Sequence, residues 1–178
     1  MTEGEETENV RSGPSARRAL DAMDRRISGA LAADATISYA DLSKRVGLSA
    51  AAVHERVRRL RASGAIRGTT ADLDGPAMGK PLLGFVHVDT VGWGKTKGLM
   101  ALADFPEVEE IHSSTGDTCV ILKVRVASPH ALEGLLSRVY DLPGVRGTNT
   151  YIALSTYLER GVQAGVTKTL ETEDHVRD

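Results

Sequence analysis

Apolar positions in the first third of the chain recur with helical spacing, and no stretch there alternates as a strand does. One such stripe spans residues 20–31 and ends before Asp34. A short second helix is expected after Ser38, an N-cap residue with Asp41 three positions later. A third helix is expected between Ser49 and Gly64. The pattern therefore predicts three helices before residue 68.

From Pro81 onward, short runs rich in β-branched residues alternate with helical segments. The expected strands and helices are, in chain order, strand 82–90, helix 95–105, strand 108–115, strand 119–127, helix 128–142 and strand 145–158. Two corners, ADFPEV (103–108) and YDLPGV (140–145), share the pattern Asp-x-Pro-x-Val. Two matching β-α-β halves are typical of a ferredoxin-like βαββαβ domain. We therefore predict an α+β chain with a helical domain before this one.

Composition changes along the chain suggest where these domains begin and end. The first residues are acidic and polar, and the segment after the third helix contains Gly75, Pro76 and Gly79. The predicted parts are a disordered acidic leader (1–15), a helical domain (16–68), a hinge linker (69–80), a βαββαβ domain (81–160) and a C-terminal tail (161–178).

Charge is distributed unevenly although the chain as a whole is nearly neutral, with a net charge of −2 at pH 7. Residues 38–70 carry seven lysines and arginines against only Asp41 and Glu55. A basic patch in a neutral chain favours a phosphate-bearing partner. The single cysteine fits a reducing cytosol, and no signal peptide or apolar run of about 18 residues is present. We expect a cytoplasmic protein without membrane contact.

The third predicted helix has an apolar side and a basic side. Val53, Val57 and Leu60 share one face, and Glu55 and Arg58 lie on the opposite one. A solvated cationic face is the simplest interpretation of such a helix. A capped helix, a three-residue turn at 47–49 and a predicted extended wing after Gly64 instead favour a winged helix-turn-helix that binds the major groove of double-stranded DNA.

The geometry of such modules assigns roles to the exposed residues, because the first turns of a recognition helix reach base edges and outlying cations reach phosphates. Candidates for base contacts are Ala50, Ala51, His54 and Glu55. Candidates for phosphate contacts are Ser49, Arg58, Arg59, Lys44 and Arg67, with Ser38 and Tyr39 at the start of the second helix. For Arg56 two interpretations remain open, a DNA contact or a stem on apolar surface with a carboxylate partner.

Other function classes fit the sequence less well. The five histidines show no spacing typical of a metal site or a catalytic triad, so an enzyme is not expected, nor a metal or cofactor. With only 4% aromatic residues, a base-stacking platform for RNA is not favoured. The remaining alternative is an amino-acid-sensing regulatory subunit that acts on a protein partner and uses the basic helices as protein contacts.

Three segments carry a resemblance to a known family. LDAMDRRISGAL, ISYADLSKRVGLSAAAVHERVRRLRASGAIRG and LPGVRGTNTYIAL resemble, in order and spacing, segments of the Lrp/AsnC (feast/famine) transcription regulators. The resemblance covers residues 19–159 and implies a winged helix-turn-helix joined to an effector-binding domain called RAM. It also implies homodimers formed through the sheets, higher oligomers such as octamers, and association with the nucleoid. The family's range of targets suggests control of amino-acid metabolism genes, for example an alanine dehydrogenase gene.

The resemblance further implies an amino-acid effector bound between subunits at the loop SSTGDTCV. The matching positions are Ser114, Thr115, Gly116, Asp117 and Thr118 in the loop, and Thr148 and Thr150 on the last strand. Hydroxyls and exposed N–H groups there suit a carboxylate, and Asp117 suits an ammonium group. Many family members have an aspartate where this chain has Cys119, which leaves the contact to the amino group open.

Overall fold

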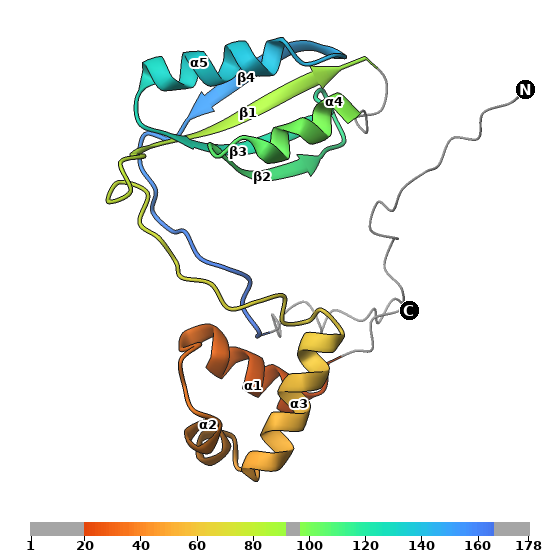
Figure 1. Ribbon diagram of the computed structural model, residues 1–178, viewed down its shortest axis with the longest axis vertical. Coiled ribbons are helices and arrows are strands. Elements are labelled where there is room, and N and C mark those ends of the chain that lie inside the picture. The colour runs from red at the N-terminus through yellow and green to blue at the C-terminus, as the bar shows by residue number, and fades with distance from the viewer. Residues whose placement is uncertain (1–19, 92–96, 166–178) are drawn as a thin grey trace, which may run out of the picture. The chain divides into compact units, whose positions relative to one another are not determined.

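The computed structural model describes residues 20–91 and 97–165 (Figure 1). The predicted leader and the tail beyond residue 165 lie outside the described residues. The described chain forms two compact units, one of residues 20–70 with 160–165 and one of residues 71–159. The first unit contains the three expected helices, α1 (Ala22–Ala33), α2 (Tyr39–Val46) and α3 (Ala50–Ala62).

The helices of this unit begin and end at the residues that the sequence indicated. The Ser38 hydroxyl accepts a hydrogen bond from the N–H of Asp41 at 3.1 Å, which caps α2. Gly47 ends α2 with a φ of 75°, a left-handed conformation that favours glycine. The core of the unit consists of Ile27, Ala30, Leu42, Val46, Val53, Val57 and Leu60. Local capping and one shared core thus produce the helix-turn-helix.

The segment after α3 differs from the expected wing. Residues 67–74 form neither a helix nor a strand, and they are exposed. A β wing needs a neighbouring strand to pair with, and the described part of this unit contains helices only. Further on, the predicted linker contains a turn in which the N–H of Lys80 donates to the carbonyl of Gly75 at 2.8 Å.

The second unit has the predicted element order. It comprises β1 (Leu82–Thr90), α4 (Lys97–Met100), the 3₁₀ helix η1 (Ala101–Asp104), β2 (Val108–Ser113), β3 (Val120–Val126), α5 (Pro129–Tyr140) and β4 (Val145–Ile152). The strands form one antiparallel sheet in the order β2-β3-β1-β4 (Figure 1). The predicted α+β class and βαββαβ arrangement are confirmed.

The two corners with the shared Asp-x-Pro-x-Val pattern have matching hydrogen bonds. The N–H of Val108 donates to the carbonyl of Phe105 at 2.9 Å, and the N–H of Val145 donates to the carbonyl of Leu142 at 3.2 Å. Arg138 of α5 joins the two halves, because its guanidinium lies 2.6 Å from a Glu107 carboxylate oxygen. The sequence repeat therefore corresponds to a structural repeat.

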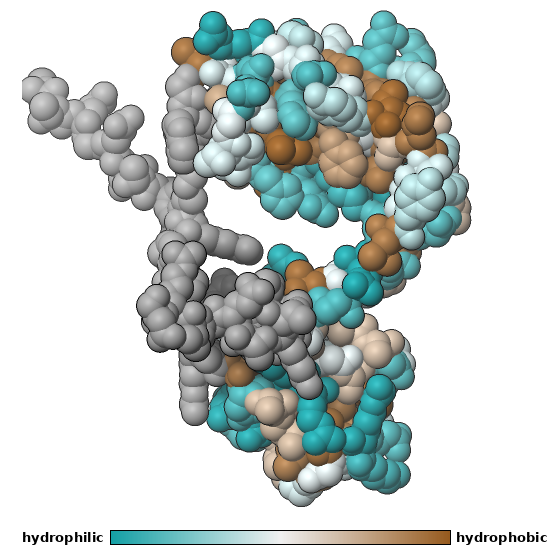
Figure 2. Space-filling model, turned by 180° about the vertical axis from the view of Figure 1, so that it is seen from behind, coloured by the Kyte–Doolittle hydropathy of each residue, from teal (hydrophilic) through white to brown (hydrophobic). Residues whose placement is uncertain are grey.

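One face of the sheet is covered and the other is open. The buried cluster on the covered face comprises Val86, Val88, Leu99, Leu102, Val120, Leu122, Val124, Val126, Leu132, Leu135 and Val139, from the sheet and both helical segments. Strand alternation turns Phe85, Tyr151 and Lys123 to the opposite face, where Phe85 is 39% and Tyr151 is 54% exposed. The space-filling view shows apolar side chains among polar ones on this unit (Figure 2).

Two expected elements are shorter than the sequence pattern suggested. β4 ends at Ile152, and the last backbone bond to β1 runs from the N–H of Ala153 to the carbonyl of Leu83 at 3.0 Å. β1 begins at Leu82, so residues beyond 153 have no strand opposite them. The expected helix 95–105 is one α-helical turn followed by a 3₁₀ turn, and residues 95 and 96 lie outside the described residues. Within the described ranges, the helices are too short and too polar to cross a membrane.

Candidate functional site

The basic side of α3 is exposed, as its amphipathic pattern indicates. Val53, Val57 and Leu60 are buried, so the opposite side of the helix faces outward. The predicted base-contact residues Ala50, Ala51, His54 and Glu55 and the predicted phosphate-contact residues Arg58 and Arg59 are all exposed. Ala50 and Ala51 are small, which allows close approach of the first helical turn to a surface.

Glu55 and Arg58 form a two-point ion pair on this exposed side. Arg58 Nε lies 2.9 Å from one oxygen of Glu55 and Nη2 lies 2.7 Å from the other. The hydrogen bond from Arg58 lowers the pKa of the Glu55 carboxyl and raises the pKa of the guanidinium. Both side chains are more than half exposed, at 53% and 65%. The sequence predicted roles for both residues but not this pair, although their i,i+3 spacing could have indicated it.

Tyr39 and His54 hold α2 and α3 together at the surface. Their rings meet edge to face, with centroids 5.3 Å apart and planes at 82°. Tyr39 is half-buried whereas His54 is exposed, so the tyrosine supports one side of the histidine ring. Tyr39, predicted as a phosphate contact, therefore also positions a predicted base-contact residue.

Several predicted phosphate contacts already have intramolecular partners. The hydroxyl of Ser49 accepts from the N–H of Ala52 at 3.2 Å, and Ser38 donates to Asp41 at 2.7 Å in addition to capping α2. The ammonium of Lys44 lies 3.1 Å from Asp41, whose pKa is lowered by Ser38 and by this lysine. The predicted contact Arg67 lies in the irregular segment after α3 and is exposed.

The predicted effector loop connects β2 and β3 at one end of the sheet. Its ends are joined by a bond from the N–H of Ser114 to the carbonyl of Cys119 at 3.0 Å. Thr115, Gly116 and Asp117 are exposed at its tip. Gly116 has a φ of 115°, and a Cβ there would meet no atom within 4 Å. The glycine is therefore needed for its backbone conformation and not for lack of space.

Thr118 and Thr148 approach the same residue of β1 from opposite sides. The Thr118 hydroxyl donates to the carbonyl of Val88 at 3.1 Å, and Thr148 is the β4 partner of Val88. Thr150 lies two residues further along β4, opposite Val86. All three threonines are half-buried. The structure thus gathers Thr118 and Thr148 around β1, whereas Thr150 lies further from the loop end of the strand.

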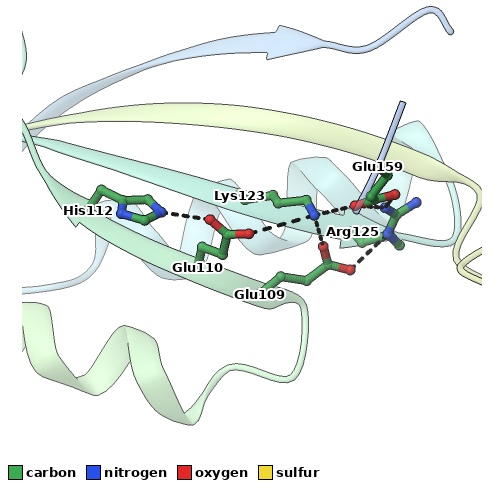
Figure 3. A network of polar contacts seen from close by, with 6 residues as sticks. All are labelled: Glu109, Glu110, His112, Lys123, Arg125 and Glu159. Carbon is green, nitrogen blue, oxygen red and sulfur yellow. Dashed lines mark hydrogen bonds and ion pairs between the residues drawn. The ribbon is translucent and has the colours of Figure 1, made fainter. Parts of the chain in front are cut away.

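The sequence did not indicate a polar network on the open face of the sheet (Figure 3). Lys123 and Arg125 of β3 both contact Glu109 and Glu159, and Arg125 Nη2 lies 2.7 Å from Glu159. Glu159 belongs to the chain after β4, so its position relative to β3 depends on tertiary structure. A cavity of about 600 Å³ adjoins this network and is lined by residues that include Asp72, Leu73, Arg125, Tyr157 and Glu159.

Comparison with known proteins identifies both units. Residues 20–61 match the AsnC-type helix-turn-helix domain, and residues 85–163 match the Lrp/AsnC ligand binding domain. The chain is 38% identical over 143 residues to the transcriptional regulator LrpA of Mycobacterium tuberculosis, covering 80% of this chain and 95% of that protein. It is 39% identical over 140 residues to the leucine-responsive regulatory protein of Escherichia coli, covering 76% and 85%.

Solved structures agree with this assignment. The feast or famine regulatory protein of M. tuberculosis, complexed with L-methionine, is similar with a TM-score of 0.73 at 37% identity, covering 79% of this chain and 96% of that one. E. coli AsnC is similar with a TM-score of 0.72 at 27% identity, covering 81% and 98%. The chain therefore belongs to the Lrp/AsnC family of DNA-binding transcription regulators with an amino-acid ligand-binding domain.

Proposed function

We propose that the exposed side of α3 binds the major groove of an operator that controls genes of amino-acid metabolism. The observation that carries this proposal is the exposure of His54, Arg58 and Arg59 on α3. This helix follows α2 in the capped helix-turn-helix. In this arrangement His54, Glu55, Ala50 and Ala51 face base edges. The phosphate contacts are Arg58, Arg59, Lys44, Arg67, Ser49, Ser38 and Tyr39, the last three with support from helix N-termini.

The charge of the helical unit supports DNA as its partner. Residues 20–70 contain nine arginines and lysines against five carboxylates. Three of these carboxylates, Asp21, Asp24 and Asp41, are engaged by Arg56 and Lys44. The family match of this unit is to a helix-turn-helix domain, which favours DNA over the alternative of a protein partner. Neither the described residues nor the relatives favour control of an alanine dehydrogenase gene, so the proposal names no target gene.

We infer that the second unit binds an amino-acid effector at the loop 114–118 together with Thr148 and Thr150. Exposed backbone and hydroxyls at the loop tip suit a carboxylate, and Asp117 suits an ammonium group. A relative with 37% identity was solved with L-methionine, which makes this amino acid the first to test. The proposal includes no other cofactor.

The open face of the sheet supports assembly of the chain into homodimers, and of dimers into larger oligomers such as octamers. Phe85 and Tyr151 are neighbours across β1 and β4 and are both exposed on this face. Apolar side chains on an open sheet face gain free energy when a second copy covers them. We place the assembled protein in the cytoplasm, in association with the nucleoid.

Binding to the protein's own upstream DNA, measured by fluorescence anisotropy across a salt series, tests the DNA proposal. Affinity is expected to fall steeply with salt because bound cations release counterions from the duplex. Arg58→Ala is expected to weaken binding to this DNA and to reduce the salt slope by roughly one unit. An affinity that does not change with salt would reject the proposal and favour the protein-partner alternative.

A thermal-shift series with the twenty amino acids, with and without this DNA, tests the effector proposal. L-methionine or another amino acid is expected to raise the melting temperature, because a ligand that binds only the folded state stabilises it. The same ligand is expected to shift the anisotropy curve. A series in which every amino acid leaves both measurements unchanged contradicts an amino-acid effector while leaving DNA binding intact.

A further inference from the structure

We propose that Glu55 and Arg58 act as one conditional contact with DNA. Arg58 leaves Glu55 and binds a backbone phosphate only where the amine of a base takes its place as the hydrogen-bond donor to Glu55. The inference rests on the proposed DNA-binding function and adds a rule for operator sequence. It predicts that each half-site presents cytosine or adenine, on the strand that faces Glu55, at one fixed position.

The ion pair neutralises the charges of Glu55 and Arg58 before DNA is bound. Both guanidinium contacts, at 2.9 and 2.7 Å, go to the two oxygens of a single carboxylate. Both side chains of the pair are exposed, and exposed ion pairs are weak enough for a polyanion to compete for the arginine. Arg58 therefore has two alternative acceptors, Glu55 and a phosphate.

The groove decides between these acceptors because Glu55 accepts hydrogen bonds and cannot donate them when it is ionised. Its pKa is lowered by the hydrogen bond from Arg58, which keeps it ionised near neutral pH. Cytosine and adenine present amine donors in the major groove, whereas guanine and thymine present acceptors at the corresponding edge. Opposite an acceptor, release of Arg58 leaves an unpaired carboxylate beside the duplex, so the arginine stays on Glu55 and the phosphate contact is lost.

Neighbouring contacts leave this pair free to act in this way. Arg56, at the next position of the helix, is bound to Asp24 of α1 and to Asp21, the N-cap residue of that helix. His54 rests against Tyr39. Among the described residues, Arg58 is the only side chain that donates a hydrogen bond to Glu55. A donor offered by a base thus competes with Arg58 alone.

The test is a selection from a random-sequence duplex library with the full-length protein and its variants. The wild type is expected to enrich cytosine or adenine at one position of each half-site. Glu55→Gln is expected to shift this position toward adenine, because a glutamine amide pairs with adenine at two points. Glu55→Ala is expected to lose the preference at this position only.

Binding to one unselected duplex supplies the second measurement. Glu55→Ala frees Arg58, so its affinity for this duplex is expected to rise roughly five- to tenfold at 0.1 M salt, with a salt slope steeper by about one unit. In the Arg58→Ala background, Glu55→Ala is expected to leave the salt slope unchanged, because no arginine is freed there to reach a phosphate. Glu133→Ala, on the exposed side of α5, removes the same charge elsewhere and is expected to change neither measurement.

The outcomes separate this inference from the function on which it rests. If the wild type binds with a steep salt dependence but Glu55→Ala keeps the same selected sequence and affinity, the conditional contact is wrong and DNA binding stands. A salt slope that Glu55→Ala steepens equally with and without Arg58 also refutes it, because simple charge removal would then explain the effect. A wild type that enriches no sequence and shows no salt-sensitive binding overturns the proposed function and this inference together.

Discussion

The guanidinium of Arg56 on α3 lies 2.6 Å from the carboxylate of Asp24 on α1, and the same nitrogen lies 2.7 Å from Asp21. The sequence left open whether Arg56 contacts DNA or a carboxylate. The structure supports the second interpretation, because the side chain is 26% exposed and joins two helices. Arg58, two residues later, is 65% exposed. Arginines on one helix thus have different roles that depend on which face they occupy.

Arg56→Ala is expected to lower the melting temperature of the protein by a few degrees, because Asp24 is only 14% exposed and loses its closer partner, which leaves only Arg59 at 3.9 Å. The salt slope of DNA binding is expected to stay unchanged. Asp24→Asn is the matched variant, and the double variant is expected to be no less stable than the worse single one. A salt slope reduced by about one unit in Arg56→Ala would instead make this arginine a phosphate contact.

His54→Ala is expected to relax discrimination at one base step by about 1–3 kcal/mol, because a contact to a base edge is lost. Tyr39→Leu is expected to cause part of the same loss, since the histidine ring loses its edge-to-face support. Relative affinities across a series of single-base operator variants measure both effects. Identical relative affinities for wild type and His54→Ala would remove the histidine from base recognition.

Asp117→Asn is expected to weaken the response to an amino-acid effector without changing the fold, because it removes a charge from an exposed loop tip. Gly116→Arg is expected to abolish the response, but it also forces a side chain into a backbone with a φ of 115°. Calorimetry of both variants with L-methionine, beside a circular dichroism spectrum, separates these causes. If both variants bind L-methionine as tightly as the wild type does, the effector site does not lie at this loop.

Acid is expected to weaken the second unit through Glu159. The hydrogen bond from Lys123 lowers the pKa of Glu159, with Arg125 acting in the same direction and partial burial opposing both. A carboxylate whose pKa is lowered in the folded state stabilises the fold at pH values above the ordinary glutamate pKa of about 4.3. This stability is lost as the pH falls through the lowered pKa. Glu159→Gln is therefore expected to reduce the fall in melting temperature as the pH is lowered below about 5. Glu133→Gln on α5 serves as the control, and equal slopes for wild type and Glu159→Gln would contradict this role.

Local patterns in the sequence predicted most of the fold. A helix cap contacts only the adjacent turn of its own helix. The capping roles of Ser38, Gly47 and Ser49 could therefore be predicted from the spacing alone. The repeated corners at 103–108 and 140–145 indicated the βαββαβ order for the same reason. Errors occurred where a strand needs a partner far along the chain, as in residues 153–158 and the expected wing.

The sequence named the residues of the candidate site, whose roles remain predictions, but it did not indicate the contacts that these residues make. The pair between Glu55 and Arg58 is local and could have been expected from its spacing. The link from Arg56 to Asp21 spans 35 positions, and that from Lys123 to Glu159 spans 36. Such contacts depend on how elements pack, which hydrophobic periodicity does not specify. The roles assigned to the loop 114–118 remain predictions.

Cys119 lies where the loop 114–118 joins β3, and its carbonyl closes the base of that loop. A hydrogen bond to Thr90 lowers the pKa of its thiol, which favours the reactive thiolate. It is the only cysteine of the chain. A fluorescent maleimide is therefore expected to label the unmutated protein at a single known point beside the proposed effector loop, where its emission would report binding of an amino acid and exchange between the proposed subunits.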